Sequence, residues 1–134
     1  MVCLDSSVII DLLRKKLDFA QLESKFGENE IVKIPSPAII EIIRGLYLNS
    51  NLSNIRENEK ERIDKLFSSF PILHLDKESA IKAGEIEANL INKGEIIDME
   101  DILIAAICIS NKDSLITRNK KHFERIRDLE VEDY

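Results

Sequence analysis

Cysteine is scarce in this sequence, which has only two among its 134 residues. Both Cys3 and Cys108 lie inside apolar runs, and neither has a second cysteine or a histidine at the spacing of a zinc site. We therefore expect both to be reduced thiols in the core. Because 44% of the residues are hydrophobic, a domain of this length can bury a core without disulfides or a structural metal.

Long apolar runs are also missing. The first run, which begins at Val2, is interrupted by Asp5, and no basic leader precedes it. No stretch approaches the roughly 18 uninterrupted apolar residues that a membrane span requires. We therefore expect a soluble, unprocessed protein that acts in the cytoplasm.

Positive charge is in deficit as well. Lys and Arg number 19 against 25 Asp and Glu, which gives a net charge of −6. Proteins that bind nucleic acid without regard to sequence usually carry a basic face, so the bulk charge argues mildly against such binding. The basic residues are unevenly placed, however, at residues 14–16, at Arg44 and between Arg118 and Arg125. A local basic patch stays open, and the fold decides whether it forms.

Short apolar runs bounded by turn residues predict five strands, at residues 2–5, 31–34, 71–75, 114–117 and 129–132. Apolar residues at helical spacing fill the intervals. They predict helices at residues 7–15, 19–26, 36–48, around 63–70, 77–91 and 98–110, with the polar stretch 49–59 as a loop or hinge. Because strands that alternate with helices form parallel sheets, we expect one α/β domain over residues 1–134, with a parallel five-stranded sheet and helices on both faces.

Four acidic residues are predicted to meet at the carboxyl edge of this sheet. Asp5 ends the first strand, and Glu41 lies one to two turns into the helix that leaves the second strand. Asp98 and Asp101 stand three residues apart at the start of a helix that leads into a parallel strand, so they share one helical face near the same edge. Ligand sites of open α/β folds lie at this edge.

Carboxylates that converge in this way repel one another. At about 5 Å and an effective dielectric constant near 20, each like-charged pair costs roughly 3 kcal/mol. A raised pKa, cationic side chains, helix N-termini or a bound divalent cation can compensate. Oxygen ligands with room for water suit Mg²⁺ or Mn²⁺, and such an ion can activate water for attack on a phosphodiester.

The same residues carry a resemblance to a known family. Four segments resemble the four motifs of PIN domains: residues 4–11 (LDSSVIID), 41–45 (EIIRG), 98–106 (DMEDILIAA) and 115–119 (LITRN), the last followed by His122 and Phe123. The motifs occur in order over nearly the whole chain, and they are most similar to those of the VapC toxins of toxin–antitoxin pairs. One such motif alone is weak, but the four together are specific.

The resemblance implies a parallel-sheet nuclease fold, Mg²⁺ or Mn²⁺ as cofactor, RNA hydrolysis that leaves a 5′-phosphate, a homodimer, and a small antitoxin protein as partner. By position, Asp5, Glu41 and Asp101 take the catalytic and metal-binding roles. We further expect Asp98 as a metal ligand, Ser7, Thr117 and Asn119 as supporting residues, and Arg118, Lys120 and Arg44 as contacts to RNA phosphates. Many PIN domains have an acid where this chain has Asn119, whose neutral amide brings no charge to a second metal ion.

Other interpretations of these residues stay open at this point. Asp5 and Asp98 also suit helix N-caps, and Asp98 fits that role as well as it fits metal binding. His122 has no carboxylate at useful spacing, so we expect it to contact phosphate or cap its turn rather than act as a general base. We expect Glu100 on a solvated face. The isoleucine-rich stripe of the helix at 36–48 is first of all core, and secondly a groove for a partner.

Three other functions remain alternatives. A response-regulator receiver also builds an acidic Mg²⁺ pocket, but it needs an aspartate at the end of its third strand and a lysine at the end of its fifth. Here Asp76 follows a late strand, and the last strand ends in Glu132 and Asp133. A catalytically silent PIN scaffold is disfavoured by the three retained acids. A PIN nuclease of RNA maturation shares the same chemistry, and the compact chain favours the toxin only by analogy.

Overall fold

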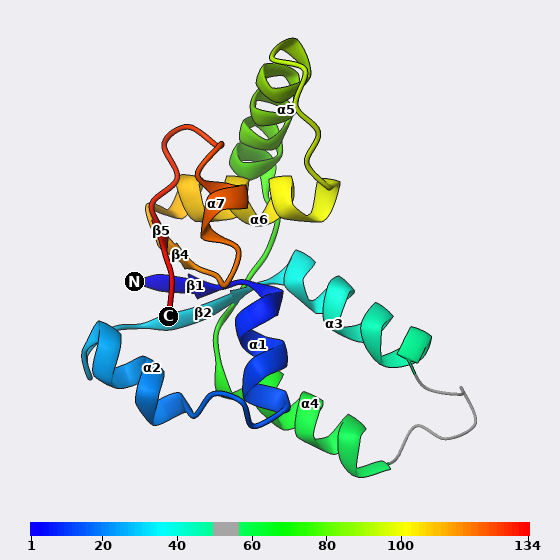
Figure 1. Cartoon of the computed structure of the whole chain (residues 1–134), viewed down its shortest axis with the longest axis vertical. Coiled ribbons are helices and arrows are strands. Elements are labelled where there is room, and N and C mark those ends of the chain that lie inside the picture. Colours follow the sequence, from blue (N-terminus) through cyan, green and yellow to red (C-terminus); the bar gives the residue numbers. More distant parts are fainter. Residues whose placement is uncertain (50–56) are drawn as a thin grey trace.

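Five short parallel strands form the sheet on which the rest of the chain packs (Figure 1). The computed structural model describes residues 1–49 and 57–134. The strands are β1 (Val2–Leu4), β2 (Val32–Pro35), β3 (Ile72–Leu73), β4 (Ser114–Ile116) and β5 (Val131–Glu132). Their order is β3-β2-β1-β4-β5, and every neighbouring pair is parallel. The direction in which successive strands are added therefore reverses between β1 and β4.

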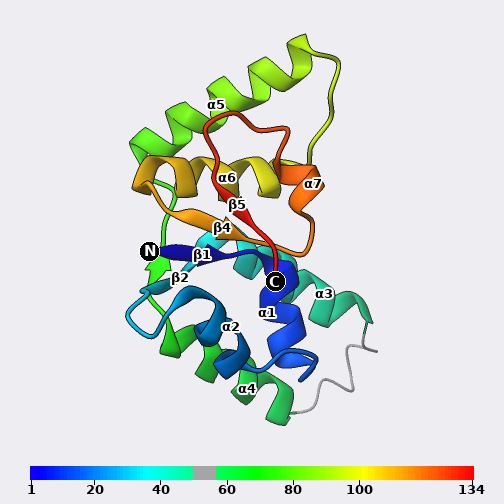
Figure 2. The ribbon, with the colours of Figure 1, turned by 60° about the vertical axis from the view of Figure 1, so that its left-hand side comes forward.

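Helices cover both faces of the sheet, as expected from the sequence. They are α1 (Ser6–Leu13), α2 (Phe19–Phe26), α3 (Ser36–Asn49), α4 (Glu57–Ser69), α5 (Lys77–Asn92), α6 (Met99–Asn111) and α7 (Lys120–Phe123). Figures 1 and 2 show α5, α6 and α7 on one side of the sheet, and α1, α2 and α4 on the other. The helix α3 packs against both α1 and α6, so it connects the two layers next to the carboxyl end of β1.

The central strand and α6 form the middle of the core. Every residue of β1 is buried, because neighbouring strands and helices on both faces enclose it. In α6, six residues are buried, and they face in several directions because α5 packs on one side of the helix while the sheet lies on the other. Both cysteines, Cys3 and Cys108, are free and fully buried, as expected. No helix in the described ranges is both long and apolar enough to cross a membrane.

The helix α5 starts at a capping box that settles the position of Asp76. Its Oδ1 accepts a hydrogen bond from the backbone N–H of Ser79 at 2.8 Å, and Ser79 Oγ accepts one from the backbone N–H of Asp76 at 2.8 Å. Asp76 follows β3, which is an edge strand. The carboxylate of Asp76 therefore caps a helix, and it lies away from the centre of the sheet. The receiver alternative is wrong.

Element boundaries differ from the expected ones mainly by one or two residues. The strands expected at 71–75 and 129–132 shorten to Ile72–Leu73 and Val131–Glu132. The helix α4 already begins at Glu57, inside the polar stretch 49–59 that was expected as a loop or hinge. Residues 50–56 of that stretch lie outside the described residues. The short helix α7 was not expected, because four residues are too few to show a helical period.

Candidate functional site

The site lies where the order of the strands reverses. Residues Leu4 of β1 and Ile116 of β4 are partners in the sheet, so Asp5 and Thr117, which follow them, emerge side by side. The backbone N–H of Asp5 donates to the carbonyl oxygen of Ile116 at 3.0 Å and extends the pairing by one residue. In open α/β sheets, ligands bind at this kind of position.

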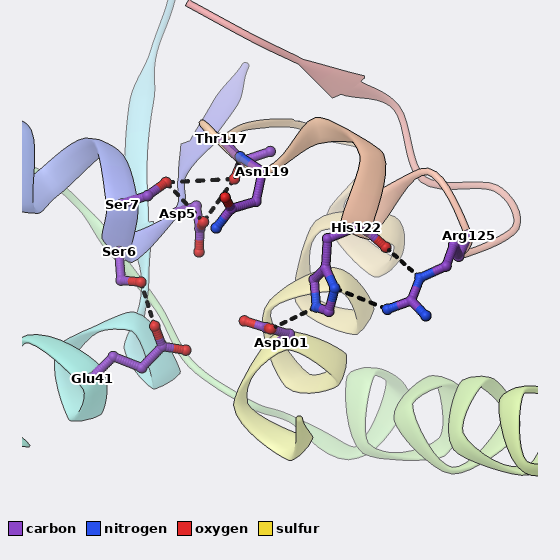
Figure 3. A network of polar contacts seen from close by, with 9 residues as sticks. All are labelled: Asp5, Ser6, Ser7, Glu41, Asp101, Thr117, Asn119, His122 and Arg125. Carbon is purple, nitrogen blue, oxygen red and sulfur yellow. Dashed lines mark hydrogen bonds and ion pairs between the residues drawn. The ribbon is translucent and has the colours of Figure 1, made fainter. Parts of the chain in front are cut away.

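Three carboxylates converge here, as the sequence predicted (Figure 3). Asp5 follows β1, Glu41 comes from α3, and Asp101 comes from the first turn of α6. Each offers an oxygen atom, and these atoms all lie within 4.8 Å of one another. In the described ranges, no other set of three or more acidic, histidine or cysteine side chains is arranged to hold a metal ion.

Asp5 is held through only one of its two oxygens. Its Oδ2 accepts hydrogen bonds from Thr117 Oγ1 at 2.7 Å and from Ser7 Oγ at 3.0 Å. The backbone N–H groups of Asn119 and Arg118 donate to these hydroxyls at 3.0 Å and 3.2 Å, which leaves the hydroxyl hydrogens directed at Asp5. The other oxygen, Oδ1, is buried and has no hydrogen-bond partner among the described residues. A buried carboxylate oxygen needs a donor or a cation, and a bound cation would satisfy this one.

Glu41 holds a proton more tightly than an ordinary glutamate. Burial raises the pKa of Glu41 to about 7; a hydrogen bond from Ser6 opposes the rise, and the charges of Asp101 and Asp5 add to it. Ser6 Oγ donates to Oε2 of Glu41. The raised pKa of Glu41 therefore comes first from burial, and the repulsion expected from the sequence adds a smaller part.

Asp101 has a partner that the sequence analysis missed. The Nε2 atom of His122 lies 2.9 Å from Oδ2 of Asp101, although 21 residues separate them in the chain. Burial and the charge of Asp5 raise the pKa of Asp101, while the hydrogen bond with His122 acts in the opposite direction. The expectation that His122 only contacts phosphate or caps its turn missed this contact, because no local spacing connects α7 with α6 and only the folded sheet brings them together.

Asp98 does not join the cluster. It occupies the N-cap position of α6, but its side chain makes no capping hydrogen bond there. Neither of the two roles weighed for Asp98 is therefore seen in the described residues. Asp5 likewise precedes α1 without capping it by its side chain, because its carboxylate is bonded to Ser7 and Thr117 instead.

A polar groove of about 860 Å³ extends from the cluster along the start of α7. Asp101 and His122 line its acidic end. Its other lining residues include four of the sequence-predicted basic or polar residues, namely Arg118, Asn119, Lys120 and Lys121. Asp98, Glu124 and Asp133 line the groove as well, so Arg118, Lys120 and Lys121 bring cations next to the site without making a purely basic patch.

Two of the three expected phosphate contacts are tied to buried or half-buried acids. The Nη1 atom of Arg118 lies 2.8 Å and 2.9 Å from the two carboxylate oxygens of Asp11, which also accepts a hydrogen bond from Tyr134 Oη at 2.6 Å. Arg44 forms an ion pair with Glu100, so Glu100 does not stand alone on a solvated face as expected. This contact lowers the pKa of Glu100 and raises that of Arg44.

All three expected phosphate contacts nevertheless remain reachable from solvent. The side chains of Arg118 and Arg44 are each 52% exposed, and that of Lys120 is 41% exposed. Lys120 has only a loose pair with Glu124 at 3.9 Å. Each cation therefore keeps a face that is free to meet an anion from solvent.

A doubly covered parallel sheet with an acidic cluster at its switch point is the arrangement that the family resemblance implied. The sequence matches the PIN domain family over residues 2–129. Ribonuclease VapC1 of Methanocaldococcus jannaschii is 32% identical over 99% of this chain and 86% of its own length. The tRNA(fMet)-specific endonuclease VapC of Shigella flexneri is 27% identical over 98% of this chain and 96% of its own.

Solved structures agree with the sequence matches. VapBC2 of Rickettsia felis, bound to a DNA fragment from its promoter, has a chain that superposes with a TM-score of 0.84 at 27% identity and covers 100% of this chain and 99% of that one. DNA-bound VapBC of Salmonella typhimurium gives a TM-score of 0.83 at 26% identity, with 99% and 98% covered. The chain belongs to the PIN domain family and, within it, to the VapC ribonucleases.

The pKa of Glu41 predicts how the metal-free protein responds to pH. The folded state holds this proton up to about pH 7, whereas an unfolded glutamate releases it near 4.5. Between these values the folded state binds more protons, so the free energy of unfolding falls as pH rises and stays lower above pH 7. We expect the melting temperature of the metal-free protein to decline over this range, and Glu41→Gln to flatten the decline.

The measurement is a series of thermal melts in chelator at stepped pH. Glu23→Gln is the matched control, because Glu23 is exposed on α2 and should leave the profile of the wild type unchanged. Equal slopes for the wild type and Glu41→Gln would show that Glu41 does not titrate in this range.

Proposed function

We propose that this protein is a metal-dependent endoribonuclease and the toxin of a toxin–antitoxin pair, with a PIN domain over residues 1–134. The single observation that carries the proposal is the triple of Asp5, Glu41 and Asp101 with the buried, unpartnered Oδ1 of Asp5 in its midst. The VapC ribonucleases and VapBC complexes that the chain resembles support it. Because the proposed RNA substrate and antitoxin partner would both be inside the cell, the cytoplasm is the location we propose.

Asp5, Glu41 and Asp101 would hold Mg²⁺ or Mn²⁺, since both ions prefer oxygen ligands. When bound, such an ion activates water as a nucleophile and neutralises charge on the phosphodiester. Ser7 and Thr117 keep the carboxylate of Asp5 fixed through Oδ2, and Ser6 does the same for Glu41 through Oε2. We leave Asp98 outside this ligand set, because it is not part of the cluster.

The groove beside the cluster is the proposed path of the RNA backbone. Arg118 and Lys120 line this groove, and Arg44 lies outside it, close enough to Glu41 to feel its charge. We assign these three partly exposed side chains to the phosphates of the RNA. Asn119 also lines the groove, and its neutral amide can bond a water or a phosphate oxygen. Local cations of this kind can bind phosphates even where the whole protein is acidic.

An antitoxin is the proposed protein partner. Apolar side chains from α1, α3 and α4, among them Ile10, Leu13 and Ile42, line a second groove of about 510 Å³, with Arg14, Lys15 and Arg62 also in its wall. A groove with apolar and charged lining suits an amphipathic segment of another chain. We propose that this segment crosses α3 and α4 and directs a basic side chain at the three acids. The homodimer implied by the resemblance stays a prediction.

Cleavage should require a divalent cation and leave 5′-phosphate ends. Water is the proposed nucleophile, because an ion held by the three acids would activate it. Its oxygen bonds to phosphorus while the bond from phosphorus to the 3′-oxygen breaks. Purified protein is incubated with mixed structured RNAs in Mg²⁺, in Mn²⁺ and in chelator, and the ends of the products are analysed. Cleavage that persists in excess chelator would refute metal dependence.

Asp5→Asn should abolish cleavage without weakening the metal-free fold. The asparagine oxygen can still accept from Ser7 and Thr117, while its uncharged amide ends the repulsion with the other two acids. We therefore expect a metal-free melting temperature equal to or above that of the wild type. With saturating Mg²⁺ the wild type gains stability by linkage, and the variant gains less.

Thermal melts with and without Mg²⁺, beside an RNA cleavage assay, measure both effects. Asp64→Asn is the matched control, since Asp64 is exposed on α4 and its change should alter neither quantity. An Asp5→Asn protein that unfolds would make Asp5 a structural residue, and one with full activity would place the active site elsewhere.

The toxin assignment makes a prediction of its own. Overexpression in the native host should slow growth, and coexpression of a small protein encoded alongside should relieve it. Leu13→Lys should prevent the relief but keep RNA cleavage, because Leu13 lines the apolar groove and is not part of the acidic site. Ile91→Lys is the control, since Ile91 on α5 is 65% exposed and does not line this groove. Normal growth together with partner-free protein would favour an RNA maturation nuclease instead.

A further inference from the structure

His122 stands between a candidate metal ligand and an arginine. Its Nε2 lies 2.9 Å from Oδ2 of Asp101, and its Nδ1 lies 2.8 Å from Nη2 of Arg125 (Figure 3). Arg125 also donates from Nε to the backbone oxygen of His122 at 3.1 Å. The guanidinium group is thus fixed at two points on the same residue. This arrangement has no part in the roles described so far.

The chemistry of arginine decides which nitrogen of His122 carries the hydrogen. A guanidinium group has only donors, so Nδ1 of His122 must be the acceptor of the contact with Arg125. The ring hydrogen is then on Nε2, which donates to Asp101. Arg125 therefore selects the one neutral form of His122 that can donate to Asp101.

The same pattern recurs at all three acids of the cluster. Asp5 is held at Oδ2 by two hydroxyls, and Glu41 is held at Oε2 by Ser6. Asp101 is held at Oδ2 by His122. A side-chain donor of the protein thus engages one oxygen of each acid, and the second oxygen can serve a cation. At Asp101 this donor is a planar ring with a fixed N–H direction instead of a rotating hydroxyl.

We propose that His122, oriented by Arg125, is a positioning residue that fixes the carboxylate of Asp101 for the metal ion. The inference rests on the proposed function, because it concerns the same ion. Partners that orient a metal ligand from outside typically change metal affinity by about 10- to 100-fold when they are removed. A residue that only joined α7 to α6 would change the stability of the fold and leave the affinity of the folded protein for the ion unaltered.

The test measures Mn²⁺ affinity directly. Metal-free protein is titrated with Mn²⁺, and the electron paramagnetic resonance signal reports the concentration of free Mn²⁺. His122→Ala should weaken binding by about 10- to 100-fold. His122→Gln should stay within about threefold of the wild type, because its side-chain amide can place an N–H near the position of Nε2. The Mn²⁺ affinity of Arg125→Met should lie between those of His122→Ala and His122→Gln, since Nδ1 of His122 then loses the donor that fixes the ring. Arg127→Met makes the same change at an exposed arginine outside the groove; it is the control and should bind as the wild type does.

Two further measurements separate positioning from structure. In an Asp101→Asn background, His122→Ala should weaken Mn²⁺ binding no further, because the carboxylate it orients is gone. In RNA cleavage, the kcat of His122→Ala should return toward the wild-type value at saturating Mn²⁺. All variants are melted in chelator, and we expect little change because the His122 side chain is only partly buried, with 33% exposed.

Each result supports or overturns the inference. A wild type that binds Mn²⁺ and cleaves RNA, together with a His122→Ala protein that binds Mn²⁺ equally well, overturns this inference alone. Equal losses for His122→Ala and His122→Gln with lowered melting temperatures also overturn it, since the ring would then be structural. A wild type that binds no Mn²⁺ overturns the proposed function and this inference with it.

Discussion

Repulsion among three carboxylates is the constraint that shapes this molecule. Asp5, Glu41 and Asp101 place oxygens within 4.8 Å of one another, where each like-charged pair is unfavourable by about 3 kcal/mol at an effective dielectric constant near 20. Arg44 and Arg118 each form an ion pair with an acid outside the cluster. Burial, with an added contribution from the charges of the neighbouring acids, raises the pKa values of Glu41 and Asp101. A site in this state is prepared for a positive charge that comes from solution.

The parallel sheet is what allows the acids to meet while the fold stays stable. Their three elements, the end of β1 and the helices α3 and α6, are anchored by a core that includes all of β1 and six residues of α6. Since apolar burial around these elements is extensive, the backbone can hold the carboxylates together against their repulsion. The hydroxyls of Ser7 and Thr117 add fixed donors to the most buried acid, Asp5. The stability of the fold therefore comes from the helices packed on the sheet, and part of this stability offsets the repulsion among the three acids.

Much of this arrangement could be predicted from the sequence, because it depends on patterns along the backbone. Alternating strands and helices gave the parallel sheet, and their ends gave the positions of Asp5, Glu41 and Asp101. The contacts of His122 with Asp101 and of Arg44 with Glu100 were not foreseen, because they join residues 21 and 56 positions apart and depend on side-chain reach in the folded state. Asp98 precedes α6 as its N-cap residue, next to where the sequence placed it, but three-residue spacing could not show that its carboxylate stays outside the cluster.

The helix α3 serves two surfaces with adjacent residues. Glu41 belongs to the acidic cluster, while Ile42 is buried and lines the apolar groove. Successive residues of an α-helix differ by about 100° in direction, so this division depends on the rotational phase of the helix. A substitution in α3 changes one surface at a time, but the deletion of one residue before Glu41 would turn both surfaces together. The acidic site and the groove therefore both depend on the rotational phase of α3. Evolution can change the amino acids of this segment far more freely than the number of its residues.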